Sequence, residues 1–231
     1  MLELDPYALL QLREDGPVNI FMLDLDPRAA AQAHCDKHVV KMILETAQLL
    51  SSAWHALDNA MYRPLAEDPA DDQLTPWLQR IVKPAETAAA APLKRERVLP
   101  GESPGSCWEL HGQRIYNKTH ENHPSAVWAR ELGGNYLWLW RLGAALCAEY
   151  THRYGKRHAT ESVLWTLEAV PPSLLASTDS WTECPPTMPD ECKVVVDGFY
   201  DTVLSYRTYY MQRKQQLLHW TKRPPPSWAE A

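Results

Sequence analysis

The chain has 231 residues with 45% apolar character, enough for a sizeable core in one large domain or two small ones. No window approaches the roughly 18 consecutive apolar residues of a membrane span, and no signal-peptide pattern opens the sequence, so we expect no membrane partner and a cytoplasmic location. A net charge of −6 excludes a protein that coats nucleic acid with its whole surface, and five cysteines without a C-x-x-C pair argue against a disulfide framework.

The charge is unevenly distributed along the chain. Residues 111–160 carry seven Lys or Arg against three Asp or Glu, and residues 200–223 carry five against one. By contrast, residues 1–26 carry six acidic residues against one Arg. The two basic segments are the footprint that DNA, an anionic polymer, would need on an otherwise acidic protein, although helical surfaces also cluster charge without binding anything.

The first elements expected in chain order are a buried apolar segment and a long helix. Residues 18–25 form a short apolar run, which predicts a strand or a buried extended segment. Asp26 and Pro27 predict the N-cap and first turn of a helix that continues to about residue 57. We expect a break in this helix near Cys35.

The middle of the chain predicts an insertion followed by a second helical block. Residues 58–112 are rich in Pro and Ala without a continuous period, and we interpret them as a loop-rich insertion. The second block begins near Pro124 and is interrupted at Gly133. Asn135 is then the expected cap of a long helix that stops at Gly155.

The C-terminal part predicts a short helix over 161–169, a Pro-rich loop over 171–190 and an amphipathic helix over 200–222. The fold class is therefore mainly α, as one compact helical domain. The predicted organisation is an N-terminal extension (1–18), a helical catalytic-type domain (19–223, with the insertion at about 58–112) and a C-terminal tail (224–231).

Polar side chains form one narrow stripe on the first long helix. At 100° per residue, an arc of about 80° holds five of them while the rest of the circumference is apolar, which indicates a helix buried on most sides. The stripe can line a cleft in which a carboxylate and an imidazole flank one substrate group. The alternative is simply the exposed face of a buried helix. The five residues are His34, His38, Lys41, Glu45 and Gln48.

A metal site is a competing interpretation of the same helix. His34 and His38 have the i, i+4 spacing that lets two imidazoles share an ion, and His120 with His123 could complete the ligand set. The catalytic H-E-x-x-H arrangement is absent, and paired histidines are common on surfaces. We therefore predict neither a metal nor a cofactor.

Several motifs resemble proteins encoded by tailed bacteriophages. They are NIFMLDLDP, HCDKHVVKMILETAQLL, NKTHENHPSAVWAR, NYLWLW, EYTHRYGKRH, MPDECK and YRTYYMQRKQQLLHW. More distantly, their order resembles that of the phage pyrimidine-dimer DNA glycosylases of the endonuclease V type. The shared elements are Asp36-x-His38 followed seven residues later by Glu45, an Asn-His-Pro block, and a helix that ends in Glu149-x-x-x-Arg153-Tyr-Gly.

The resemblance implies a compact helical enzyme that binds DNA, kinks it and cuts the glycosidic bond of a damaged pyrimidine. In that family the α-amine of the processed N-terminus attacks the sugar C1′ to give an imine, while a glutamate assists. An α-amine with a pKa near 8 is partly neutral at pH 7 and therefore nucleophilic. Carried over, Glu45 matches the glutamate, His38 matches a histidine beside the DNA, and the amine falls near Asn19.

The sequence departs from that family in three places. The arginines that flank the family's glutamate correspond to Leu44 and Gln48. Eighteen residues precede Asn19, so either they are removed, or translation begins at Val18, or the amine chemistry is lost. The insertion at 58–112 has no counterpart in the compact enzymes.

Other candidate DNA contacts lie near helix ends in the basic segments. The histidines before Pro124 could bind an anion or cap the helix, and the cations near Gly155 could bind phosphate or stabilise the helix dipole. Rings and bases that alternate over 206–214 suit either a nucleic-acid groove or a helix laid on its own domain. The candidate contacts are His34, Lys41, Gln48, Lys118, His120, Asn122, His123, Arg130, Arg153, Lys156 and Arg157.

These observations lead to one principal hypothesis and two alternatives. The first is a phage DNA glycosylase or glycosylase/AP-lyase that acts on a damaged or modified pyrimidine in the infected bacterial cell, with DNA as its partner. The others are a base- or nucleotide-modifying enzyme on the same scaffold and a non-catalytic module that binds DNA or a host protein. The first predicts that Glu45 lies in a cleft on which His38, the Asn122-His123 loop and the Arg153 cluster converge.

Overall fold

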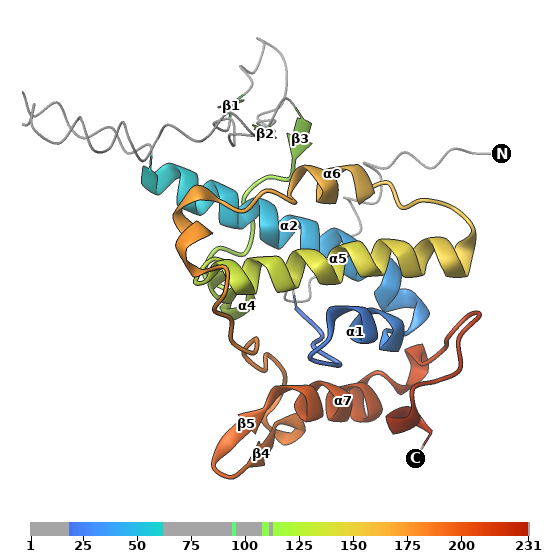
Figure 1. Ribbon diagram of the computed structural model, residues 1–231. Coiled ribbons are helices and arrows are strands. Elements are labelled where there is room, and N and C mark those ends of the chain that lie inside the picture. The colour runs from blue at the N-terminus through green and yellow to red at the C-terminus, as the bar shows by residue number, and fades with distance from the viewer. Residues whose placement is uncertain (1–18, 62–93, 96–107, 111–112, 231) are drawn as a thin grey trace, which may run out of the picture.

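The computed structural model describes residues 19–61, 94–95, 108–110 and 113–230, and this part of the chain is mainly helical. Its two longest helices, α2 (Asp36–Met61) and α5 (Gly133–Tyr154), pack against each other at the centre (Figure 1). The shorter α1 (Pro27–Ala33) also packs on α5. Residues 1–18, the predicted N-terminal extension, lie outside the described residues.

The N-terminal elements follow the sequence prediction closely. Residues 19–23 are buried and extended without forming a strand. The carboxylate of Asp26 caps α1 by accepting the backbone N–H groups of Arg28 and Ala29, and Pro27 occupies the first turn. The chain leaves helical geometry after Ala33 and resumes it at Asp36, which confirms the predicted break.

The second helical block begins as predicted, with a histidine cap, but its long helix is capped differently. α4 (Pro124–Ala129) has His123 as its N-cap, and α5 has Leu132. The prediction that Asn135 caps α5 is therefore wrong: Asn135 lies in the first turn, where its buried amide bonds Thr182 and the carbonyl oxygen of Trp128. The amide is used to hold a distant loop against the helix.

The ends of α5 depend on glycine for two different reasons. A Cβ at Gly134 would lie 2.2 Å from the carbonyl oxygen of Ser180, because the segment after residue 171 crosses this end of the helix. At the other end Gly155 adopts φ +68°, which confirms the predicted helix stop.

The C-terminal part contains more irregular structure than the sequence predicts. α6 spans Glu161–Thr166, and two short 3₁₀ helices, η2 (Pro172–Ser177) and η3 (Asp190–Cys192), follow it. A hairpin of β4 (Val194–Val196) and β5 (Phe199–Asp201) turns at residues 197 and 198, both with positive φ. This hairpin was not predicted.

The predicted helix over 200–222 is wrong at both ends. α7 spans only Thr202–Arg213, because Asp201 caps its start by accepting the N–H of Leu204 at 2.8 Å and residues after Lys214 leave helical geometry. Two 3₁₀ turns follow, η4 (Gln215–Leu217) and η5 (Ser227–Ala229).

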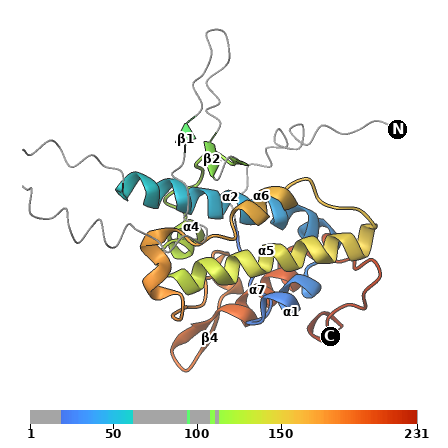
Figure 2. The ribbon, with the colours of Figure 1, turned by 45° about the horizontal axis from the view of Figure 1, so that its top comes forward.

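Of the predicted insertion at 58–112, the structure describes the end of α2 and two short strands, and a third strand follows directly after it. β1 (Lys94–Arg95), β2 (Trp108–Leu110) and β3 (Gln113–Ile115) pair antiparallel in the order β1-β2-β3, with Trp108 opposite Ile115. In both views these strands lie on the side of α2 and α6, while α7 and β4 lie on the opposite side (Figure 2). None of the described helices is both long and apolar enough to cross a membrane.

A cation-lined pocket around a buried carboxylate

A pocket of about 630 Å³ lies where α2 meets the extended segment at residues 19–23 and the C-terminal part of the chain. It gathers five side chains that the sequence analysis selected, from three separate segments of the chain. They are Asn19, His38, Lys41, Glu45 and His123. Their convergence agrees with the expectation of a cleft at Glu45, and their catalytic and DNA-binding roles stay predictions.

Glu45 is the buried carboxylate of this pocket. Its Oε2 accepts the backbone N–H of Asn19 at 3.2 Å, and its Oε1 lies 3.1 Å from Nζ of Lys41. Burial raises the pKa of Glu45, although Lys41 and the Asn19 N–H act in the opposite direction. A carboxyl group with a raised pKa is suited to proton transfer, because it can donate as well as accept nearer to neutral pH.

The side chain of Asn19 is fixed by hydrogen bonds from remote residues. Its Oδ1 accepts from the backbone N–H of Ile20 at 2.8 Å and from the hydroxyls of Thr187 and Tyr206, both at 2.7 Å. Its Nδ2 donates to the carbonyl oxygen of Thr187 at 3.1 Å. The amide of residue 19 therefore belongs to the pocket wall rather than to its open space.

His38 presents a neutral imidazole to the pocket. Its ring stacks on Phe21 with centroids 4.5 Å apart, and its Nδ1 lies 2.5 Å from the hydroxyl of Tyr210. Burial is the main cause that lowers the pKa of His38 to about 3. Within the described part of the chain, Nε2 of His38 has no hydrogen-bond partner, so it is available to a group in the pocket.

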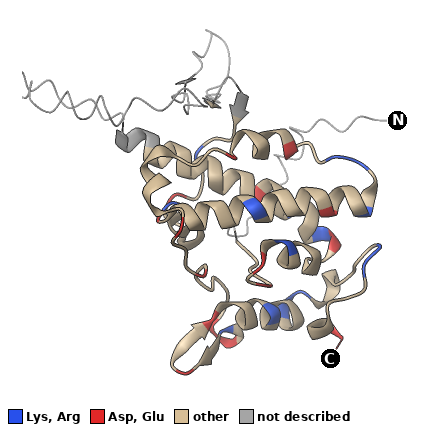
Figure 3. Ribbon diagram, viewed as in Figure 1, with Lys and Arg blue, Asp and Glu red and all other residues tan. Residues whose placement is uncertain are grey.

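Two lysines from the C-terminal part complete the lining. The ammonium of Lys214, the residue after α7, lies 5.1 Å from the ring centroid of Tyr209, and Lys193 lies 2.7 Å from Asp190. With Lys41 they give three cations against two carboxylates, Glu45 in the lining and Asp190 paired with Lys193, a local balance of +1 on a chain of −6. Figure 3 shows Lys and Arg positions along α7 below the helical layer.

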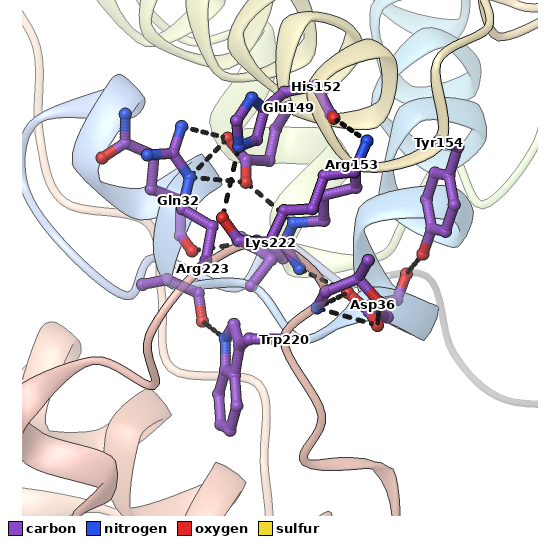
Figure 4. Close-up of polar contacts among 12 residues, drawn as sticks. Gln32, Asp36, Glu149, His152, Arg153, Tyr154, Trp220, Lys222 and Arg223 are labelled. Carbon is purple, nitrogen blue, oxygen red and sulfur yellow. Dashed lines mark hydrogen bonds and ion pairs between the residues drawn. The ribbon is translucent and has the colours of Figure 1, made fainter.

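The Arg153 cluster does not converge on this pocket, so that expectation is wrong. Arg153 is only 2% exposed and donates to Glu149 at 2.7 Å, to Asp36 at 2.8 Å and to the carbonyl oxygen of Gln32 at 3.1 Å (Figure 4). Arg223 pairs with the same glutamate at 2.9 Å. A guanidinium enclosed in this way cannot reach a DNA phosphate.

Asp36 joins the C-terminal segment to the same cluster. It accepts the backbone N–H and hydroxyl of Thr221 and lies 2.7 Å from Nδ1 of His219. Burial alone would raise the pKa of Asp36, but these hydrogen bonds and the one from Arg153 outweigh it and lower the pKa to about 2. The Asp36 carboxylate is thus charged at neutral pH.

The remaining predicted contacts lie outside the pocket within the described residues. His34 is fully buried in the turn after α1, and its Nδ1 bonds the carbonyl oxygen of Ala30 at 2.6 Å. Burial lowers its pKa to about 4. The others are half-buried Gln48, exposed Lys118, His120 and Asn122, half-buried Arg130, and exposed Lys156 and Arg157 at the end of α5.

Two pocket features had little signal in the sequence. Thr187 lies in the predicted Pro-rich loop. Lys193 ends the MPDECK motif, whose residues do not by themselves indicate a function. The alternation over 206–214 did contain a signal, because it brings Tyr209 and Lys214 to the lining. Among the described residues, no three His, Cys, Asp or Glu side chains are grouped so that they could hold a metal ion.

Comparison with protein-family models, with curated proteins and with solved structures finds no match for this chain. The fold and site therefore define it as a mainly helical protein with a single-carboxylate pocket rimmed by lysines. Such a pocket combines a group for proton transfer with positive charge for an anionic substrate.

Proposed function

We propose that this protein is a DNA glycosylase or glycosylase/AP-lyase for a damaged or modified pyrimidine, active in a form whose chain begins at Asn19. The observation that supports this most strongly is the 3.2 Å contact between the nitrogen of Asn19 and Oε2 of Glu45. In a chain that begins at Asn19 this nitrogen is an α-amine. By the resemblance of the motifs, it would then correspond to the α-amine nucleophile of the phage glycosylases of the endonuclease V type.

The proposed reaction needs one nucleophile and one proton carrier. The neutral amine of residue 19 forms a bond to C1′ of the target nucleotide, the bond from C1′ to the base breaks, and the base leaves with the bonding electrons and takes up a proton. Glu45 then transfers protons as the amine loses its own and the sugar ring opens to the imine. A carboxyl whose pKa is raised by burial is suited to that exchange.

The size and charge of the pocket support a nucleotide substrate from DNA. A volume of about 630 Å³ is within the range of pockets for small molecules and holds one nucleotide unit, not a duplex. The target would therefore have to leave the base stack before C1′ could meet the amine. Lys41, Lys193 and Lys214 would attract the phosphates on either side of it.

One observation favours a second candidate, a base- or nucleotide-modifying enzyme on the same scaffold. In the 231-residue chain the nitrogen of Asn19 belongs to a peptide bond and cannot form an imine. In that form Glu45 and Nε2 of His38 are the available proton-transfer groups, and a group transfer to a base could use both. The two candidates differ in whether a covalent bond to the protein forms.

Borohydride trapping separates them. The chain is released from a cleavable fusion so that Asn19 is its first residue, and it is incubated with DNA that contains ultraviolet-damaged pyrimidines or an abasic site. We expect a covalent adduct with this chain, none with the 231-residue chain, and at least a hundredfold loss on Glu45→Gln. Glu131→Gln, which removes an exposed carboxylate outside the pocket, is the matched control. No adduct with either chain would contradict the proposed amine chemistry.

A further inference from the structure

The amide oxygen of Asn19 is held by two hydroxyl groups from the C-terminal part of the chain. Tyr206 lies in α7, and Thr187 lies between Pro186 and Pro189 in the segment before η3. We infer that Tyr206 and Thr187 are positioning residues, which keep the nitrogen of residue 19 directed at Glu45. The inference rests on the proposed function, because it assigns these residues to the nucleophile of that reaction.

The hydrogen bonds form a closed arrangement around one atom. The hydroxyls of Tyr206 and Thr187 both lie 2.7 Å from Oδ1 of Asn19 and 3.1 Å from each other. The carbonyl oxygen of Thr187 accepts from Nδ2 of Asn19, so the amide is held at both ends. Because Tyr206 is fully buried, its pKa lies well above the ordinary value and its hydroxyl remains a donor.

Fixing this side chain also fixes the backbone nitrogen. The nitrogen and the side chain share one Cα, so an amide held at both ends leaves the nitrogen little freedom to rotate away from Glu45. The carbonyl side is fixed as well, because Oδ1 also accepts the N–H of Ile20. In a chain that begins at Asn19 no preceding residue would restrain the amine, and these contacts would be its principal restraint.

The supporting elements are themselves well anchored. Tyr206 lies one turn into α7, whose start is capped by Asp201 and whose first residue, Thr202, donates to the carbonyl oxygen of Cys184 at 3.1 Å. The prolines on both sides of Thr187 have a fixed φ, which limits the motion of that segment. The two hydroxyls therefore have fixed positions of their own and can hold the side chain of Asn19 in place.

The rate at which an amine reacts depends on how precisely its nitrogen is positioned. A displacement of about 1 Å between reacting groups can lower a rate by roughly a hundredfold, even when both groups remain chemically intact. Removing both hydroxyls should therefore lower imine formation by a factor on the order of a hundred.

The test measures how strongly the charge of Glu45 changes the pKa of the α-amine. In the chain that begins at Asn19, labelled with ¹⁵N, the pKa of the α-amine is determined by NMR with and without Glu45→Gln. We expect that substitution to lower the amine pKa, because it removes an adjacent negative charge. In the double variant Tyr206→Phe, Thr187→Val the effect of Glu45→Gln should shrink to less than half.

Matched controls and a conservative variant keep the test specific. Tyr136→Phe and Thr160→Val each remove one buried, hydrogen-bonded hydroxyl elsewhere and should leave the effect of Glu45→Gln intact. The single variant Thr187→Ser retains both hydroxyls and should show the full effect of Glu45→Gln. A full effect would also show that the segment around residue 187 tolerates substitution and still folds. An unchanged effect of Glu45→Gln in the double variant overturns the inference.

Trapping in the same variants separates this inference from the proposed function. If the unsubstituted chain forms no adduct while the Glu45 effect depends on the two hydroxyls, the proposed reaction is wrong and the positioning holds. If the adduct forms at the same rate and with the same pH profile in the double variant, the positioning is wrong and the reaction stands.

Discussion

The backbone nitrogen of Asn19 lies 3.2 Å from Oε2 of Glu45, although the two residues are 26 positions apart. The contact joins the extended segment before α1 to the third turn of α2, across the break between the two helices. It is formed between two buried groups, since both residues are only 7% exposed. Buried polar groups need hydrogen-bond partners, and each of these two groups provides one for the other. The contact therefore fixes the position of residue 19 in the fold.

Protonation of two buried histidines should destabilise the protein in acid. His34 and His38 have folded-state pKa values of about 4 and about 3, below the ordinary 6.5. Below pH 6.5 the unfolded chain therefore binds more protons than the folded one. The free energy of unfolding should fall by up to about 1.4 kcal/mol per pH unit for each histidine between pH 6.5 and 4. Above pH 6.5 the slope from both histidines fades as the unfolded chain also loses its protons.

Urea unfolding at several pH values measures this dependence. Replacing His34 by Gln should flatten the acid side of the stability profile, whatever its effect at pH 7. Replacing His219, which is exposed and pairs with Asp36, is the comparison. A profile with the same acid slope in the His34 variant would show that another group titrates there.

Arg153→Ala should be strongly destabilising. The substitution leaves Asp36 and Glu149 without a buried guanidinium between them, and such a loss typically costs about 3–5 kcal/mol. Arg141→Ala, an exposed arginine on the same helix, should change the free energy of unfolding by less than about 0.5 kcal/mol. Denaturant titration of both variants at pH 7 compares them. Equal stability of the two would mean that Arg153 is not structural.

Lys214→Gln should weaken binding to DNA more than Lys156→Gln. Lys214 lines the pocket, whereas Lys156 is an exposed residue beyond the end of α5, which sequence reasoning had also selected. The loss of one phosphate contact should lower the slope of log affinity against log salt by about one. Fluorescence anisotropy at four salt concentrations gives both slopes. A larger loss for Lys156 would indicate that DNA binds near the C-terminal end of α5 rather than at the pocket.

Gly134→Ala should destabilise the start of α5. The added Cβ would lie 2.2 Å from the carbonyl oxygen of Ser180, so the crossing segment must move. Overpacking of this kind typically costs about 1–3 kcal/mol. Glu131→Ala, at an exposed position just before the helix, is the comparison in thermal unfolding. A fully tolerated Gly134→Ala would indicate that the crossing segment is loosely held.

Local signals predicted the helices, and tertiary contacts decided which polar residues meet. The Asp26 cap, the break near Cys35 and the stop at Gly155 follow from the preferences of single residues. The polar stripe predicted the pocket through His38, Lys41 and Glu45. It failed at His34 because that residue lies in the turn between two helices, where a continuous helical projection does not apply.

Other features depend on residues too distant in sequence for any periodicity to connect. Thr187 and Tyr206 lie 168 and 187 positions from Asn19, and only the fold shows that both reach its amide. The i, i+4 spacing of Glu149 and Arg153 is visible in the sequence, but the pairing of Arg153 with Asp36, 117 positions away, is not, and so Arg153 looked like a free cation at a helix end. A charge count over a segment cannot tell a paired cation from an available one.

The bonds of Asp36 make the last stretch of the chain a support for the first turn of α2. The carboxylate of Asp36 bonds His219 and Thr221, and its backbone N–H donates to the carbonyl oxygen of His219. Asp36 lies two residues before His38, which lines the pocket. Shortening the chain before residue 219 would therefore act at a distance: the truncated protein would keep every pocket side chain and still lose the contacts that hold the first turn of α2.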